Sequence, residues 1–440
     1  MNEIIIKALQ LILSLSILVI IHEFGHFFFA RLFKTRVEKF YLFFNPWFSI
    51  AKKKIGETEY GIGWLPLGGY VKISGMIDES MDKEQMKMPP QPYEFRSKKA
   101  WQRLLIMLGG ILFNIILAFF IYSMVLFTWG EKYLPASEVT YGIMTDSIGY
   151  KVGLRNGDKI ISLDNKPVDN FRKIVHDILL EDIKTIQVKR NDSIINILLP
   201  SDIKADLVKN PTFLEVRIPF IVDAFISNSA GEKAGIKKGD KFIAINDSAV
   251  TYFDEVRAML SRHKNEKVTL KLLRNNDTVS LTLTIPPDGK LGIFPLSDLE
   301  KFFKLKEIHY GFFESIPAGF VKTFSMLDSY IKQFKLIFSP ETKAYESVGG
   351  FISIGKIFPA EWDWLSFWSM TAFLSIILAF MNLLPIPALD GGHVLFLIFE
   401  IITRRKPSDK FLEYAQIVGM AILFALLIFA NGNDIIKLFK

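Results

Sequence analysis

The sequence contains no cysteine, and only 6 of its 440 residues are histidine. Without cysteine, the chain forms no disulfide bond, binds no metal through thiolates and has no cysteine nucleophile. Low-complexity tracts are also absent. Because 50% of the residues are hydrophobic, the composition excludes a disordered chain and is unusual for a single soluble domain. Any metal site must therefore be built from a few histidines and from carboxylates.

Long apolar runs are the most prominent feature of the sequence. A helix needs roughly 20 apolar residues to cross a bilayer, and four runs approach or exceed that length. They cover residues 8–30, 104–129, 368–384 and 415–430. The first run lacks a small-residue cleavage site and ends with charged and histidine side chains, so we interpret it as a retained helix rather than a signal peptide. The run at 393–402 is too short to span.

The basic charge of the chain indicates how it lies in the membrane. The net charge is +7, and residues 31–103 alone carry 14 Lys and Arg against 8 Asp and Glu. By the positive-inside rule this loop faces the cytoplasm, as does the turn with Arg404 and Arg405. The segment between the second and third runs then lies on the outer side. The charge reflects orientation, and we expect contact with the lipid bilayer and none with nucleic acid.

The outer segment contains an internal repeat. The sequence G-L-R-N-G-D-K-I-I at 153–161 recurs as G-I-K-K-G-D-K-F-I at 235–243, and a helical stretch and alternating strands follow each copy. This pattern resembles the PDZ fold of bacterial proteases. We therefore predict two tandem PDZ domains of the α+β class, at 134–210 and 211–300.

The expected fold is a polytopic α-helical membrane protein with about four transmembrane helices, the two PDZ domains and a re-entrant β-hairpin. The membrane domains cover residues 1–133 and 367–440. Between the repeats and the third span, residues 301–366 carry phenylalanines at helical spacing, such as Phe320 and Phe324, interleaved with lysines. This spacing predicts an amphipathic helix that lies on the membrane or on the domain beneath it.

The segment H-E-F-G-H at 22–26 is the clearest chemical signal. Positions i and i+4 of a helix share one face, so His22 and His26 can bind one ion. Glu23 can take a proton from a water molecule that zinc has acidified. Two histidines and a glutamate inside a membrane helix are costly without a partner, which favours an intramembrane metal site over chance.

A zinc site needs a third protein ligand at the same depth. Asp390 follows the third span in a wholly apolar neighbourhood, where a lone carboxylate needs a counter-charge. An aspartate before two glycines is also a common turn residue. His393, three residues further on, is a rival ligand or a structural group. The residues by themselves leave these alternatives open.

The segment Y-G-I-G-W-L-P-L-G-G-Y-V-K-I at 60–73 is apolar, rich in glycine and too broken for a helix. It is either an ordinary cytoplasmic hairpin or a re-entrant β-hairpin, at about 60–75, beside the active site. In the second case its open edge can pair with an extended substrate strand. The candidate substrate-binding residues in this segment are Gly61, Gly63, Leu67 and Gly68.

Taken together, these features resemble the site-2 protease family, M50, of intramembrane zinc metalloproteases. The resemblance covers nearly the whole chain. It includes H-E-x-x-H, the glycine-rich segment, the tandem repeats and the segment N-x-x-P-x-x-x-L-D-G-G at 382–392. It implies one Zn²⁺ per chain, held by His22, His26 and Asp390, with Glu23 as general base. It also implies that Asn382 helps to hold the substrate strand and that the glycine-rich segment is a re-entrant β-loop.

The resemblance further implies a location and a class of substrate. The protein is expected in the bacterial cytoplasmic (inner) membrane, with its active site near the cytoplasmic side and its PDZ domains on the outer side. Expected substrates are single-pass membrane proteins such as anti-sigma factors and remnant signal peptides. An upstream site-1-type protease acts first, and the PDZ pair admits only the shortened product.

One segment departs from the family pattern. Before the third span, G-G-F-I-S-I at 349–354 has Phe351 where the family often has proline, which puts the local geometry in doubt and not the chemistry. Two other function classes explain fewer of these features. A metal transporter or sensor with PDZ-like outer domains gives no reason for Glu23, and a catalytically silent scaffold leaves the intramembrane ionisable cluster unexplained.

Overall fold

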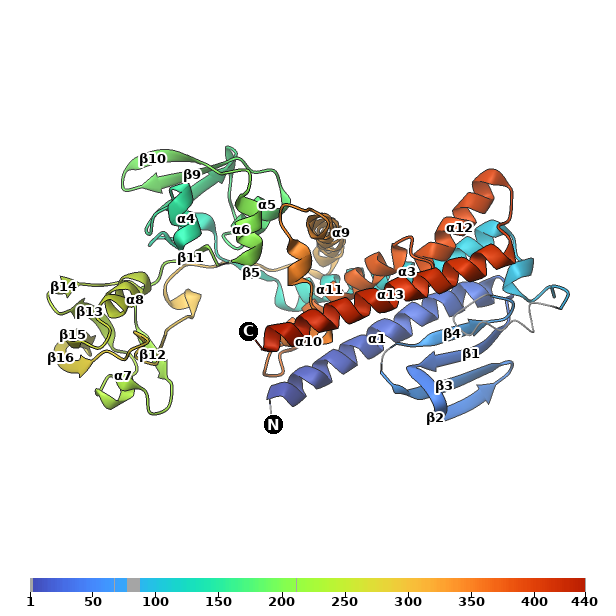
Figure 1. Ribbon diagram of the computed structural model, residues 1–440, viewed down its shortest axis with the longest axis horizontal. Coiled ribbons are helices and arrows are strands. Elements are labelled where there is room, and N and C mark those ends of the chain that lie inside the picture. The colour runs from blue at the N-terminus through green and yellow to red at the C-terminus, as the bar shows by residue number, and fades with distance from the viewer. Residues whose placement is uncertain (1–2, 67, 77–87, 211, 440) are drawn as a thin grey trace. The chain divides into compact units, whose positions relative to one another are not determined.

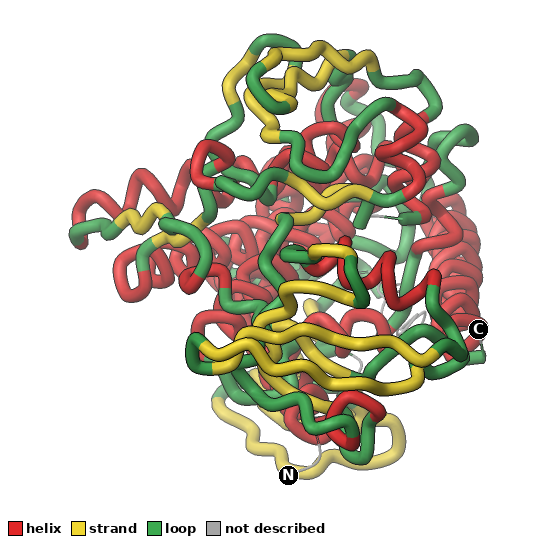
Figure 2. The backbone as a smooth tube through the Cα atoms, turned by 90° about the vertical axis from the view of Figure 1, so that its left-hand side faces the viewer, coloured by secondary structure: helices red, strands yellow, loops and turns green. Residues whose placement is uncertain are grey.

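The computed structural model describes residues 3–66, 68–76, 88–210 and 212–439, and it divides into two compact units (Figure 1). The first unit combines Met1–Glu131, His309–Phe338 and Tyr345–Lys440, and the second combines Lys132–Ile308 and Ser339–Ala344. Long helices dominate the first unit, whereas short strands and helices alternate in the second (Figure 2).

Four helices of the described chain are long and apolar enough to cross a membrane, which confirms the four predicted spans. They are α1 (Glu3–Leu32), α3 (Ala100–Trp129), α11 (Trp364–Leu383) and α13 (Asp409–Leu438). Helix α3 ends at Gly130, whose φ of 70° is unfavourable for other residues. Helix α11 ends at Leu384, which is extended because Pro385 follows it. The chain is therefore a polytopic membrane protein.

Helix α3 lies at the centre of the first unit and packs against α1, α9 and α11. Its contact with α1 is unusually close because glycines face each other. A Cβ atom on Gly25 would collide with the backbone of Gly109, and the reverse is also true. Small residues that let two helix backbones touch are the usual means of packing helices in a membrane. The sequence H-E-F-G-H thus also contains the residue that brings α3 next to the histidines.

The remaining helices of the first unit are α9 (Phe312–Ile337), α10 (Phe351–Ile357) and α12 (Asp390–Thr403). Helix α9 falls within the predicted amphipathic region, but it packs along α3. The rings of Phe312 and Phe127 lie 5.8 Å apart, and those of Phe320 and Phe119 lie 6.2 Å apart. The buried side of α9 consists of small residues, since a Cβ atom on Gly319 would collide with Ser123 of α3, while Phe312 and Phe320 stay largely exposed.

A four-stranded sheet follows α1 in the first unit. Its strands are β1 (Val37–Leu42), β2 (Phe44–Ile55), β3 (Thr58–Leu65) and β4 (Tyr70–Ile73), in the spatial order β2-β3-β1-β4. The prediction of one hairpin at about 60–75 is therefore wrong. Strand β3 forms its hairpin with β2 and pairs in parallel with β1, while β4 pairs with the other side of β1. The local pattern of residues 60–75 cannot reveal that an earlier strand lies between its two halves.

The second unit consists of two structural repeats. The first contains β6 (Ile143–Thr145), α4 (Ser147–Val152), β7 (Lys159–Leu163), β8 (Lys166–Pro167), α5 (Lys173–Leu180), β9 (Thr185–Arg190), β10 (Ser193–Leu198), α6 (Ile203–Lys209) and β11 (Leu214–Val216). The second contains β12 (Val222–Phe225), α7 (Ala230–Lys233), β13 (Lys241–Ile245), β14 (Ser248–Ala249), α8 (Phe253–Arg262), β15 (Lys267–Arg274), β16 (Asp277–Thr284) and β17 (Ile293–Pro295). The four-stranded sheets have corresponding orders, β10-β9-β7-β8 and β16-β15-β13-β14.

A short ribbon of β5 (Glu131–Tyr133) and β18 (Lys306–Ile308) joins the two ends of this unit. The 3-10 turns of the chain are η1 (Phe95–Ser97), η2 (Ala136–Glu138), η3 (Leu299–Lys301) and η4 (Ala344–Ser347).

The repeats have separate cores, and their boundary differs from the predicted one. Strand β11 pairs with β6, so the first repeat extends beyond residue 210 to Val216. Phe303 is also buried in the first core, although it follows the second repeat in sequence. The buried residues of the second core all come from the sequence range between Phe220 and Leu291. A strand that returns to the start of its own repeat is a long-range pairing that a local pattern does not indicate.

The aspartate of the repeated G-D pair has the same structural role in both copies. Asp158 accepts a hydrogen bond of 2.8 Å from Arg190, and Asp240 accepts one of 2.7 Å from Arg274. Both carboxylates are buried. Burial raises the pKa of Asp240, but the hydrogen bond and charge of Arg274 lower it more, so this pKa lies below its usual range. The repeated motif thus encodes a buried ion pair.

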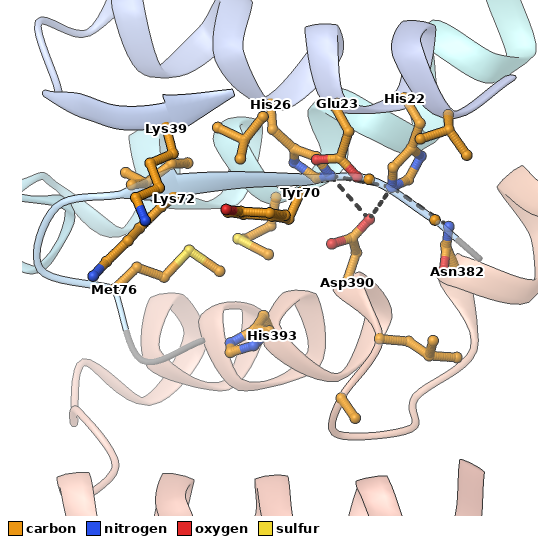
Figure 3. Close-up of a pocket in the computed structure, with 18 of the residues that line it drawn as sticks. His22, Glu23, His26, Lys39, Tyr70, Lys72, Met76, Asn382, Asp390 and His393 are labelled. Atoms are coloured by element: carbon orange, nitrogen blue, oxygen red, sulfur yellow. Dashed lines mark hydrogen bonds and ion pairs between the residues drawn. The ribbon is translucent and has the colours of Figure 1, made fainter. Parts of the chain in front are cut away.

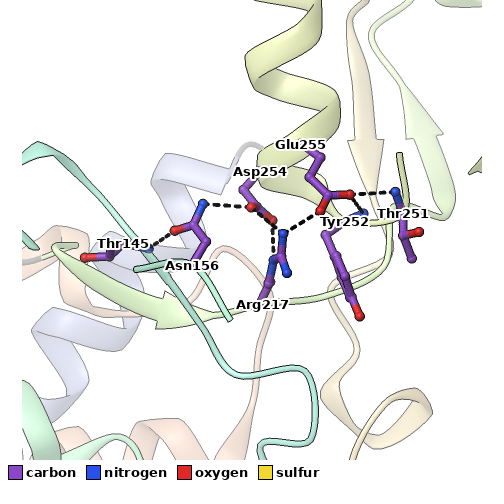
Figure 4. A network of polar contacts seen from close by, with 7 residues as sticks. All are labelled: Thr145, Asn156, Arg217, Thr251, Tyr252, Asp254 and Glu255. Carbon is purple, nitrogen blue, oxygen red and sulfur yellow. Dashed lines mark hydrogen bonds and ion pairs between the residues drawn. The ribbon is translucent and has the colours of Figure 1, made fainter. Parts of the chain in front are cut away.

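A polar network connects the two repeats (Figure 4). Arg217, just after β11, donates to Asp254 at 2.9 Å and to Glu255 at 2.7 Å, and its guanidinium lies 3.9 Å from the ring centre of Tyr252. Asn156 of the first repeat donates to the same Asp254 carboxylate at 2.7 Å. One carboxylate of the second repeat is therefore held by two side chains from the first repeat and its outgoing strand.

Candidate active site

Two histidines of α1 form the first part of the site. His22 and His26 are one helical turn apart and are both buried, with 8% and 7% of their surface exposed. Their Nε2 atoms lie 3.3 Å from each other. The arrangement follows from the i, i+4 spacing, which places both imidazoles on the face of α1 that meets α3 and α12.

Asp390 is the first residue of α12, and its side chain completes the cluster (Figure 3). Its Oδ2 atom lies 3.2 Å from the Nε2 atoms of both His22 and His26. The chain folds back sharply between α11 and α12, because a Cβ atom on Gly391 or Gly392 would collide with the backbone of residues 383–387. The two glycines after the aspartate are thus needed to bring a residue of the C-terminal part of the chain to α1.

The three atoms form a nearly equilateral triangle that fits a zinc ion. Ligands 2.0–2.1 Å from a tetrahedral Zn²⁺ are held roughly 3.3 Å from one another, and the three sides measure 3.2, 3.2 and 3.3 Å. Oδ2 of Asp390 is buried and has no hydrogen-bond partner in the described chain. Burying a carboxylate oxygen without a donor is costly, and a cation at this position removes that cost. Two imidazoles and a carboxylate are also the chemistry that zinc prefers in catalytic sites.

Helix α3 contacts the other nitrogen of each histidine. Nδ1 of His26 lies 2.8 Å from the backbone carbonyl of Ile106, and Nδ1 of His22 lies 3.2 Å from Nδ2 of Asn114. The bond from Nδ1–H of His26 to the carbonyl leaves its Nε2 lone pair free to bind a metal. Gly110 passes so close that a Cβ there would lie 2.5 Å from both imidazoles.

The cluster borders a cavity of about 540 Å³. Figure 3 shows Glu23 between the two histidines, on the wall of this cavity. Glu23 does not belong to the group of atoms that converge on a metal position. The cavity continues past Tyr70 to Lys39 and Lys72 at its other end. A carboxylate beside the cluster, and outside it, is positioned to exchange protons with a molecule in the cavity.

Asn382 and His393 also line the cavity. Asn382 lies at the end of α11, and its Nδ2 atom is 3.5 Å from Nε2 of His22. His393 lies one turn beyond Asp390 on α12 and is outside the converging group. Of the two candidates for a third ligand, the structure thus brings Asp390 to the histidines.

The four candidates from the glycine-rich segment are distributed differently. Gly68 lines the cavity, and Leu67 lies outside the described residues. Gly61 and Gly63 lie in β3, where the ring of Tyr41 and the backbone at Phe44 occupy the space of a side chain. Because β3 has a neighbouring strand on each side, it has no free edge for a peptide. Contact of Gly61 and Gly63 with substrate stays a prediction.

Sequence reasoning missed the contribution of the second span. Asn114 is fully buried in the middle of α3, and Gly109 and Gly110 precede it by about one turn. A polar amide in the centre of an apolar span was the available signal, since intramembrane polar groups are costly and often functional. Gln416 of α13, also buried and lining the cavity, carried the same signal.

A helical membrane protein that brings the two histidines of H-E-x-x-H and an aspartate around one metal position has the fold and site of an intramembrane metalloprotease. The chain belongs to peptidase family M50, whose sequence profile matches residues 10–426. It is similar over its whole length to a Vibrio cholerae protein whose name carries the term zinc metalloprotease, with 30% identity over 468 residues and full coverage of both chains.

Two further relatives bear a more specific name. They are the regulator of sigma E protease of Haemophilus influenzae and the regulator of sigma-E protease RseP of Escherichia coli. Each is 28% identical to this chain, in an alignment that covers 97% of this chain and 98% of the relative. The protein is therefore a zinc metalloprotease of the site-2 protease type. This family membership favours a protease over the metal transporter, sensor or scaffold.

Proposed function

We propose that the protein cleaves peptide bonds within the transmembrane segments of membrane proteins, with His22, His26 and Asp390 as zinc ligands. The observation that carries the proposal is the triangle of their ligand atoms, with sides of 3.2–3.3 Å, between two elements of the membrane unit. When bound, zinc supplies Lewis acidity, which activates water and polarises a carbonyl. The chain itself holds the ligands and orients them.

Glu23 acts as the general base. Its carboxylate lines the cavity next to the ligands without being one of them. From this position it takes a proton from the attacking water and returns it to the leaving amine. A glutamate that instead completed the ligand set would be unable to carry a proton.

The substrate binds as an extended strand along β4. This strand pairs only with β1 among the described strands, and its residues line the cavity. A peptide added to this edge passes the metal ligands, and its backbone pairs with Tyr70–Ile73 by β-augmentation. Gly69, just before β4, lets the chain lie close to α1, because a Cβ there would lie 2.6 Å from Val19. Asn382, at the other side of the metal ligands, holds the same strand.

The substrates are single-pass membrane proteins that an upstream site-1-type protease has already shortened, including anti-sigma factors and remnant signal peptides. The names of two relatives, regulators of sigma-E, support this class. The two repeats are tandem PDZ domains on the outer side of a bacterial inner membrane, and they act as a size filter. Their corresponding strand orders support the duplication. The basic loop supports a cytoplasmic active site.

The test is Glu23→Gln in the full-length protein, co-expressed with a membrane protein shortened on its outer side. We expect zinc content to stay at that of the wild type and cleavage to fall by about 10²–10⁴-fold, the usual contribution of a general base. Glu57→Gln is the control, because Glu57 lies exposed in the turn between β2 and β3. Cleavage by Glu23→Gln at the wild-type rate would sink the proposed mechanism.

The substrate class needs its own test. The same co-expression is repeated with the unshortened membrane protein, in the wild-type chain and in a variant that lacks residues 132–308. A size filter predicts that only the variant cleaves the unshortened protein. If both chains leave it intact while cleaving the shortened form, the repeats do not filter by size.

A further inference from the structure

Asn114 carries an unexplained polar group in the deepest part of the first unit. Its exposed fraction is 0%, and its Oδ1 atom has no hydrogen-bond partner in the described chain. Its Nδ2 atom lies 3.2 Å from Nδ1 of His22. An unsatisfied amide oxygen inside an apolar helix bundle costs free energy. Such a residue in the centre of a membrane span calls for a reason.

The chemistry of the histidine supplies that reason. When Nε2 of His22 binds a metal, the proton of the neutral imidazole sits on Nδ1, which is then a donor. The Nδ2 amide of Asn114 is also a donor, so this contact then brings two donors together and is unfavourable. Rotation of the amide by 180° exchanges its two ends, which places Oδ1 where it accepts from Nδ1–H. The oxygen that lacks a partner is thus the atom that a metal-binding His22 requires.

The packing of α3 explains how Asn114 reaches this position. Its backbone carbonyl accepts a hydrogen bond of 2.7 Å from Ser375 of α11, which fixes α3 on that side. The contact of Gly25 with Gly109 fixes it on the side of α1. Two turns before Asn114, the carbonyl of Ile106 holds His26. One helix therefore contacts both histidines, one through its backbone and the other through a side chain.

We propose that Asn114 is a positioning residue of the metal centre, which accepts the Nδ1–H of His22 and so holds its Nε2 toward the ion. An asparagine suits this role because its amide can pair with either tautomer of the histidine, as acceptor when metal is bound and as donor when it is absent. The inference rests on the proposed function, since it takes His22 as a ligand.

The experiment measures zinc affinity of the full-length protein in detergent by competition with a chelator. Asn114→Leu and Asn114→Ala both remove the acceptor, and loss of such an outer partner typically weakens metal binding by about 10–100-fold. Asn114→Asp keeps an acceptor and should restore affinity to within a few fold of the wild type. The Co²⁺ absorption spectrum, measured in parallel, should change in the Leu and Ala variants and return in the Asp variant.

Thr371→Val is the matched control. Thr371 is also fully buried, and its hydroxyl donates to Ser14 at 3.0 Å between α11 and α1, away from the ligands. It should keep wild-type affinity and spectrum. Equal weakening in the Leu, Ala and Asp variants, or unchanged affinity in the Leu and Ala variants, would overturn the positioning role. His22→Ala separates the two proposals: if it retains full zinc, the ligand set itself is wrong, and if it loses zinc while Asn114→Ala does not, only the role of Asn114 fails.

Discussion

The two units of the molecule bury carboxylates in opposite ways. In the second unit, Asp240 is enclosed by its own repeat and paired with Arg274 at 2.7 Å. In the first unit, Asp390 is partly buried beside two histidines, and its Oδ2 atom is buried without a hydrogen-bond partner in the described chain. Both carboxylates are shielded from solvent, but only Asp240 has a permanently charged partner, the guanidinium of Arg274.

This difference separates a structural charge from a functional one. A carboxylate bonded to an arginine is satisfied at neutral pH by residues of its own fold. A carboxylate that meets two imidazoles, with the three ligand atoms spaced for one ion, has the geometry to share a cation with them. Both motifs contain an aspartate, and the partner that each aspartate meets separates the structural ion pair from the proposed metal ligand.

The largest effect is expected from removing the carboxylate of Asp390 from between the two histidines. Asp390→Ala should reduce bound zinc from one ion per chain to nearly none, because two histidines alone hold zinc weakly. Cleavage should then fall by at least the roughly 10²–10⁴-fold of a lost general base. Elemental analysis of purified protein measures the zinc. Asp240→Ala is the matching change in the other unit and should keep its zinc. An Asp390→Ala protein with full zinc would remove the contrast between the two sites.

The next effect concerns the space around the ligands. Gly110→Ala would place a Cβ 2.5 Å from both imidazoles and displace at least one of them. Misplacement of a reacting group by about 1 Å can cost roughly 10²-fold in rate. We expect a loss of that size in cleavage, together with weaker zinc binding. Gly432→Ala in α13 is the control, because its Cβ would meet nothing within 4 Å. Equal activity of the two variants would show that the histidines tolerate the added methyl group.

The paired carboxylate should affect stability instead of chemistry. Asp240→Asn leaves Arg274 without its charged partner, and breaking such a buried pair costs about 3 kcal/mol. Hydrogen exchange in β13 and β15 of the full-length protein should speed up by roughly 10²-fold, while zinc content stays unchanged. Asp247→Asn, in an exposed turn of the same repeat, should leave exchange unaltered.

The same pair also predicts a dependence on pH. The pKa of Asp240 in the folded chain is lowered, although burial raises it, because Arg274 bonds the carboxylate. Its stabilisation is therefore complete above the unfolded pKa of about 3.9 and disappears as the pH falls through the lower folded value. In Asp240→Asn this acid-dependent loss should shrink. If the stability of the variant falls with pH as steeply as that of the wild type, groups other than Asp240 cause the loss of stability in acid.

The smallest effect is expected where the two repeats meet. Arg217→Ala removes the side chain that bonds Asp254 and Glu255, and it leaves both hydrophobic cores intact. We expect a broader distribution of distances between the repeats and almost no change in zinc content. Because the chain has no native cysteine, spin labels on cysteines introduced at exposed Asp192 and Asn276 can measure it. An unchanged distribution would mean that the rest of the boundary holds the repeats.

Local patterns in the sequence determined much of this protein. Four apolar runs predicted the four spans, and the i, i+4 spacing of His22 and His26 placed both on one face of α1. The G-D repeat predicted the duplication. These inferences succeed because hydropathy, helical periodicity and duplication are all properties of short, contiguous segments.

The tertiary structure decided what depends on residues far apart in the chain. It brought Asp390 to α1, placed β1 between the two halves of the glycine-rich segment, and returned β11 to the first repeat. It also set Asn114 against His22. Each is a contact between segments that share no local pattern, and its geometry depends on the close packing of helices and on strand pairing. The sequence therefore determined which residues could act, and packing decided which of them meet.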